Sequence, residues 1–156
     1  MKQLRVYVDT SVIGGCFDPE FAQWSNALLR DFEMGFFRPV LSKAIESEIL
    51  SAPEQVREKY ADLLALGAEF LPITNEANEL VERYMERGIL NARFRGDMLH
   101  IALATVFDVD VLVSWNFKHI VKLQKIQLFN AVNLEQGYKA IQIYSPREVA
   151  TDEQGV

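Results

Sequence analysis

Short apolar runs alternate with helical segments along this chain, and that alternation limits its fold more than any other feature. Candidate strands lie at residues 3–8, 36–41, 69–73, 110–114 and 141–144. Helices are expected at residues 18–35, 42–50, 51–67, 74–87, 97–107 and 117–128. Alternating strands and helices predict an α/β protein of three layers, α/β/α, with a mostly parallel central sheet.

The size and charge of the chain set broad limits on its function. Its 156 residues predict a single domain over residues 1–150, followed by a polar tail at 151–156. The formal charge of −6 excludes a generally basic surface that would coat nucleic acid, but leaves room for a local nucleic-acid site. The only cysteine, Cys16, can form no disulfide within the chain, and no apolar stretch approaches the ~20 residues that span a bilayer. We therefore expect a cytoplasmic protein without a membrane partner.

Three acidic residues are candidates for one site. Asp9 follows the first strand, at the edge where open α/β sheets build their ligand sites. Glu48 lies on an otherwise apolar helix face, where an acid needs a partner, although Glu46 is close enough in sequence to be the alternative. Asp97 opens a helix whose free N–H groups favour an ionised carboxylate. Three converging carboxylates repel one another unless a hard cation neutralises them, so we expect Mg²⁺ or Mn²⁺ here.

Polar residues next to these acids could assist them. Asn116 follows the strand at 110–114, and its amide oxygen could bind a cation, hold a metal-bound water or simply form a turn. Thr10 and Ser11 could orient the Asp9 carboxylate or satisfy the backbone of the turn. His100, three residues after Asp97, is expected to pack in or near the core with one nitrogen satisfied.

Basic residues border the expected acidic site on two sides. They are Arg93, Arg95, Lys118, His119 and Lys122. Such clusters are either solvated helix faces or contacts for the phosphates of an anionic polymer.

Four segments resemble, in order, the motifs of the PIN-domain family and, within it, of the VapC-type toxins. They are VYVDTSVIGG, LSKAIESEIL, GDMLHIALA and DVLVSWNFKHI, and the third is the most specific. The resemblance covers residues 2–146 and implies a PIN-like fold. It assigns the three family acids to Asp9, Glu48 and Asp97. Where the family often has a fourth acid, this chain has Asn116.

The resemblance also implies a function. A metal-dependent endoribonuclease would use Asp9, Glu48, Asp97 and Asn116 as its catalytic set, with the metal polarising the scissile phosphate and activating water. A VapC-type toxin would in addition form a homodimer and be blocked by a cognate antitoxin. Two alternatives remain. Because Asn116 replaces an acid, the chain could be an inactive PIN fold that binds RNA or protein. A phosphatase with an aspartate nucleophile fits less well, because the second acid expected two residues after Asp9 is Ser11.

Overall fold

The computed structural model describes residues 2–151 and contains one sheet of five parallel strands in the order β3-β2-β1-β4-β5. The strands are β1 (Leu4–Val8), β2 (Phe37–Ser42), β3 (Glu69–Leu71), β4 (Val111–Val113) and β5 (Gln142–Tyr144). Every strand expected from the sequence is present. The expected three-layer α/β/α class is confirmed, with a sheet that is wholly parallel.

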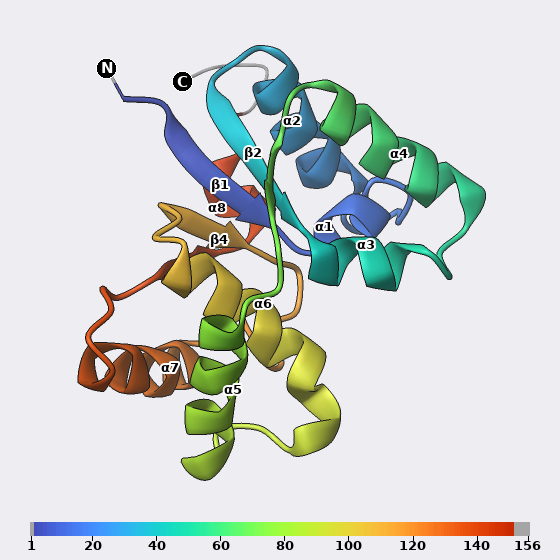
Figure 1. Cartoon of the computed structure of the whole chain (residues 1–156). Helices are drawn as coiled ribbons and strands as arrows, with labels where there is room; N and C mark the ends of the chain where they lie inside the picture. Colours follow the sequence, from blue (N-terminus) through green and yellow to red (C-terminus); the bar gives the residue numbers. More distant parts are fainter. Residues whose placement is uncertain (1, 152–156) are drawn as a thin grey trace.

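Helices cover both faces of this sheet (Figure 1). On one side lie α1 (Thr10–Gly15), α2 (Ala22–Glu33) and α4 (Glu54–Ala65), and on the other lie α5 (Asn75–Glu86), α6 (Arg95–Val106) and α7 (Leu123–Glu135). The short helix α3 (Lys43–Ile49) follows β2 and contacts both α4 and α6, while α8 (Pro146–Val149) packs on α2. None of the helices within residues 2–151 has the length and apolar character needed to cross a membrane.

The order of the strands places β1 at the centre of the sheet. Val6, Tyr7 and Val8 have no exposed surface, because β2 and β4 flank them and helices cover both faces. All strands run the same way, so their carboxyl ends share one edge. Val8 of β1 pairs with Val113 of β4, which brings the residues after these two strands together.

Two expected helices begin later than the sequence indicates. Asp18 does not cap α2, because its Oδ1 accepts from the N–H of Glu20 in a local turn and α2 begins at Ala22. The segment from residue 117 is a turn, and α7 begins only at Leu123. In both places a side-chain oxygen takes up backbone N–H groups before the helix begins.

Two further segments are helical where a turn and a loop were expected. Residues 10–15 form α1, because the Asp9 carboxylate accepts from Val12 N and caps the helix. Residues 92–94, which lie between the helices expected at 74–87 and 97–107, form a 3₁₀ turn, and α6 begins at Arg95.

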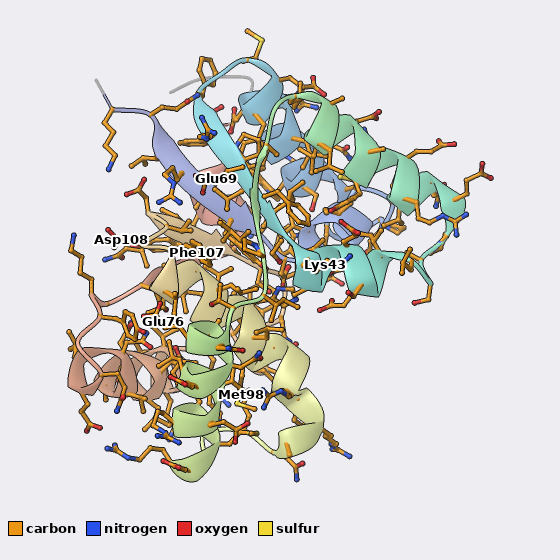
Figure 2. All side chains as sticks on the ribbon, in the orientation of Figure 1. Lys43, Glu69, Glu76, Met98, Phe107 and Asp108 are labelled. Atoms are coloured by element: carbon orange, nitrogen blue, oxygen red, sulfur yellow. The ribbon has the colours of Figure 1, made fainter. Side chains whose placement is uncertain are left out.

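Arg5 connects three elements at the edge of the sheet where the strands begin. Its guanidinium donates to the carbonyls of Phe107 and Asp108 at 3.1 and 2.9 Å and pairs with Glu69, three residues labelled in Figure 2. At the other end of the chain, Thr151 is bonded to the buried Asp31 instead of fraying. The rest of the expected polar tail, 152–156, lies outside the described residues.

Two adjacent glycines in α1 predict opposite responses to alanine. A Cβ on Gly15 would lie 2.6 Å from Ser25 Oγ and 2.8 Å from Trp115 Nε1, two atoms that are hydrogen-bonded to each other. A Cβ on Gly14 would meet nothing within 4 Å. We expect Gly15→Ala to cost about 1–3 kcal/mol through overpacking. We expect Gly14→Ala to gain up to about 1 kcal/mol. Urea denaturation of the two variants measures both, and equal midpoints would contradict this packing.

Candidate metal centre

The Asp9 carboxylate is held by hydroxyl groups from two elements. Ser11 Oγ donates to Oδ1 and Ser114 Oγ donates to Oδ2, each at 2.6 Å. Ser11 Oγ in turn accepts from the backbone N–H of Trp115. The chain that follows β4 therefore holds Ser11 in place, and Ser11 holds Asp9. Asp9 is only 4% exposed, and this burial raises its pKa. A buried carboxylate with raised pKa is one that a cation would stabilise.

Glu48 is the end of a hydrogen-bonded chain that starts inside the sheet. Ser42 Oγ lies 2.7 Å from the Tyr7 hydroxyl, which lies 2.6 Å from His100 Nδ1, and His100 Nε2 donates to Glu48 Oε1 at 2.7 Å. Burial opposes ionisation of Glu48, but the hydrogen bond and the charge of His100 lower its pKa. Glu46 instead pairs with Lys43 on the outside of α3. Of the two acids considered, Glu48 is therefore the one directed towards α6.

Asp97 lies in the first turn of α6, where two residues of the 116–119 turn hold its Oδ2. Asn116 Nδ2 donates to this oxygen at 3.2 Å, and His119 Nδ1 lies 2.9 Å from it. The oxygen of Asn116 is already used, because it accepts from the N–H groups of Lys118 and His119. Asn116 therefore presents an amide nitrogen to Asp97, and its contact is with the acid itself.

The charges of all three acids act on one histidine, which is in contact with Glu48. His100 is buried, and burial opposes its charge, but Glu48, Asp9 and Asp97 together raise its pKa. The tip of Glu48 also reaches the start of α6, since Oε1 would lie 3.7 Å from a Cβ on Gly96. The ion-pair partners of these acids within residues 2–151 are histidines, not Lys or Arg. The structure thus brings together acids 39 or more residues apart in the sequence.

The donor chemistry of this centre suits a hard cation, because all of its candidate ligands are carboxylate oxygens. In the part of the chain that the structure describes, however, no three His, Cys, Asp or Glu side chains lie close enough to enclose an ion by themselves. Mg²⁺ usually keeps several of its waters and contacts only one or two carboxylates directly. The acids therefore fit a hydrated ion that some of them reach through water.

The basic residues expected near the site separate into two groups. Lys118 and Lys122 are exposed, and Arg93 is exposed with its guanidinium 4.7 Å from the Phe94 ring. Arg95 pairs with Glu82 instead. His119 is buried against the Phe94 ring at 4.0 Å and contacts Asp97, so it belongs to the acidic centre and not to a solvated helix face.

Four residues of the centre were not singled out by sequence reasoning, or were given other roles. Ser114 holds Asp9, and Ser42 is bonded to Tyr7, which in turn is bonded to His100. Both nitrogens of His100 are bonded, where one was expected to be. Of the two hydroxyls after Asp9, Ser11 holds the carboxylate, while the buried Thr10 hydroxyl has no hydrogen-bond partner within residues 2–151. The position of Ser114 at the end of a buried strand was the one available signal.

Comparisons with solved structures identify the fold. A chain of VapBC2 from Rickettsia felis, crystallised with a DNA fragment from its promoter, matches with a TM-score of 0.58 and 13% identity, covering 91% of this chain and 98% of that one. A chain of FitAcB from Neisseria gonorrhoeae matches with a TM-score of 0.59 and 15% identity, covering 92% and 99%. A chain of FitAB bound to the IR36 DNA fragment gives 0.57 and 15%, covering 90% and 94%.

These likenesses define the class of fold. The chain has the PIN-like three-layer architecture expected from its motifs, over nearly its whole length. Neither the comparison with protein-family models nor that with curated proteins finds a match.

Proposed function

We propose that this chain is a metal-dependent endoribonuclease and the toxin of a toxin–antitoxin pair. The observation that carries the proposal is that Asp9 and Asp97 are both bound by residues that follow β4, at the carboxyl edge of the parallel sheet, without Lys or Arg partners in residues 2–151. Glu48 is bound by His100 of α6, the helix that also carries Asp97. The solved structures with this fold include VapBC2 and FitAB complexes, which supports a partner protein of the antitoxin type. We further propose that the chain acts in the cytoplasm as a homodimer.

The residues of the centre have separate tasks in this mechanism. Asp9, Glu48 and Asp97 would hold Mg²⁺ or Mn²⁺, directly or through water, and the bound ion would polarise the scissile phosphate and lower the pKa of an attacking water. Ser11 and Ser114 orient the Asp9 carboxylate, and their hydrogen bonds oppose the rise in its pKa that burial causes. The exposed residues Arg93, Lys118 and Lys122 would contact phosphates on either side of the scissile bond.

Positioning residues hold the other two acids. His100 holds Glu48, and Asn116 and His119 hold Asp97 through its Oδ2. Side chains that orient ligands in this way typically change metal affinity or activity 10–100-fold when they are removed. Asn116 in place of a fourth acid leaves the centre one negative charge weaker, which favours one bound ion over two.

RNA cleavage over a metal series tests the proposal. Purified protein should cut single-stranded RNA in Mn²⁺ or Mg²⁺, stop in EDTA, and lose activity by at least about 100-fold in Asp97→Asn. Asp62→Asn, which changes an exposed acid on α4, is the matched control and should cut normally. Activity that persists in EDTA or in Asp97→Asn would contradict a metal-dependent enzyme.

A second candidate function is an inactive PIN fold that binds RNA or protein. It is favoured by Asn116, whose amide oxygen is occupied by backbone N–H groups and adds no ligand to the centre. Protein that binds RNA equally well with EDTA and with Mn²⁺, and cuts it in neither, would support this function over the nuclease.

A further inference from the structure

An aromatic groove begins at the acidic centre and runs away from it between α1, α2 and α8. Its inner hollow, of about 420 Å³, is lined in part by Ser11, Gly14 and Asn116. Its outer hollow, of about 370 Å³, is lined in part by Trp24 and Phe117. Both hollows share Phe21 and Trp115, so they adjoin each other, and we call the two together the aromatic groove. Each volume is within the range of about 300–1,000 Å³ that is typical of small-molecule sites.

The inner end of the groove is part of the proposed catalytic centre. Ser11 donates to Asp9, and Asn116 donates to Asp97, so both residues contact a candidate metal ligand and line the groove. A part of the substrate bound in this hollow would therefore be only a few covalent bonds from a phosphate bound at the acids. This continuity makes the groove a candidate subsite for the same substrate.

The walls of the groove are rigid aromatic surfaces. Trp115 is fixed by its Nε1, which donates to Ser25 Oγ at 2.8 Å, and its ring stacks on Phe21 with centroids 4.3 Å apart. Phe117 meets Trp115 edge-on at 6.0 Å and is 50% exposed, which leaves much of its ring uncovered. Trp115 is only 8% exposed and supports Phe117, whose exposed ring is the kind of platform on which unpaired bases stack.

The charges around the groove favour a base over a phosphate. Asp18 lines the inner hollow, and Glu20 and Glu148 line the outer one, against a single basic residue, Arg147. Carboxylates repel phosphate, but they accept hydrogen bonds from the N–H groups on the edge of a neutral base. The base must be unpaired, because a base within a duplex cannot leave its stack without cost.

We propose that the aromatic groove binds an unpaired nucleobase of the RNA substrate, next to the phosphate that is cut. This inference rests on the proposed function and adds to it a subsite for one base of the substrate. It also accounts for the exposure of Phe117 and for the glycine at position 14, which lines the inner hollow although a Cβ there would meet nothing within 4 Å.

Tryptophan fluorescence provides a direct readout, because Trp24 and Trp115 are the only tryptophans of the chain and both line the groove. A single-stranded RNA oligonucleotide, titrated into the full chain in EDTA so that it is not cut, should quench this fluorescence. An abasic oligonucleotide of equal length, which keeps the phosphates but lacks bases, should bind more weakly and quench little. Equal binding and quenching by the two would overturn the inference.

Two variants test the groove independently of each other. Gly14→Leu places a side chain in the inner hollow, where a Cβ meets nothing within 4 Å, and its melting temperature checks that it folds like the wild type. Phe117→Ala removes the exposed platform. Each should weaken RNA binding roughly 5- to 150-fold, the range expected for the loss of one stacked base. Phe36→Ala is the matched control, because Phe36 is similarly exposed but precedes β2 at the opposite edge of the sheet.

The outcomes separate this inference from the proposed function. RNA cleavage with wild-type binding in both Gly14→Leu and Phe117→Ala would overturn the groove assignment and leave the nuclease intact. If the protein neither cuts nor binds RNA, both the groove assignment and the proposed function are contradicted. A tryptophan response to an arginine-rich peptide, without one to RNA, would assign the groove to a basic protein partner and overturn the nucleobase.

Discussion

Replacing Asp9 with asparagine is expected to abolish RNA cleavage and, in EDTA, to raise the melting temperature. Burial raises the pKa of Asp9, so keeping this carboxylate ionised at neutral pH costs stability. Asparagine removes the charge and keeps the shape. We expect a gain of about 0.5–2 kcal/mol, as for other sites where function is favoured over stability. Cleavage should fall by about 1,000-fold, since a metal ligand supports several kcal/mol of transition-state stabilisation.

The hydroxyl network can adapt to asparagine at position 9. Its oxygen can still accept from Ser11 and from Val12 N, as Oδ1 of Asp9 does. Its NH₂ group would donate to Ser114 Oγ, and the Ser114 hydroxyl could then turn towards Ser11 Oγ, 3.4 Å away. No buried polar group loses its partner, which is why the change in charge should determine the stability.

Metal addition reverses the expected order of stability. Mn²⁺ should stabilise the wild type by about 2.7 kcal/mol at a hundred times its Kd, and the Asp9→Asn variant much less. Thermal denaturation with and without Mn²⁺ measures this, with Glu46→Gln as a control that changes an acid paired to Lys43 outside the centre. A variant that melts lower than the wild type in EDTA, or that responds equally to Mn²⁺, would contradict Asp9 as a buried ligand.

The second large effect is expected from the hydroxyl of one buried tyrosine. Tyr7→Phe should destabilise the fold by about 1–3 kcal/mol, because Ser42 and His100 Nδ1 would each lose a partner where no water reaches them. For a chain of this size, the melting temperature falls roughly 2–4 °C per kcal/mol. Differential scanning calorimetry measures the change.

The same variant should also affect activity. Tyr7 fixes the orientation and tautomer of His100, whose Nε2–H donates to Glu48. A loosened His100 would orient Glu48 poorly, so we expect the metal concentration needed for half-maximal cleavage to rise about 10-fold. A purely structural tyrosine would lower the melting temperature without changing this metal dependence.

Tyr60→Phe is the matched control for this prediction. Tyr60 is also buried, but among residues 2–151 its hydroxyl has no hydrogen-bond partner, so its removal should be neutral or slightly stabilising. Equal losses of stability at Tyr7 and Tyr60 would show that the Ser42–Tyr7–His100–Glu48 chain contributes nothing beyond packing.

Sequence patterns anticipated the layers of this protein because they depend on local chemistry. The alternation of apolar runs and helical segments predicted the sheet, and Ser42 and Thr74 were correctly predicted to begin helices. Local reasoning failed where side chains compete for the same backbone groups. Asp9 caps a helix where a turn was expected, and Asn116 takes N–H groups that a helix would have used.

The sequence by itself determined that Asp9, Glu48 and Asp97 are acidic residues at the ends or on the faces of otherwise apolar strands and helices. Only the tertiary structure decided what each of them contacts. Asp9 is bound by Ser114, 105 residues away, and Glu48 by His100, 52 residues away. The strand order and register set these partners, since they decide which chain ends meet at the edge of the sheet. Hydrophobic periodicity specifies which face of an element is buried, but it carries no information about which distant side chain will lie opposite.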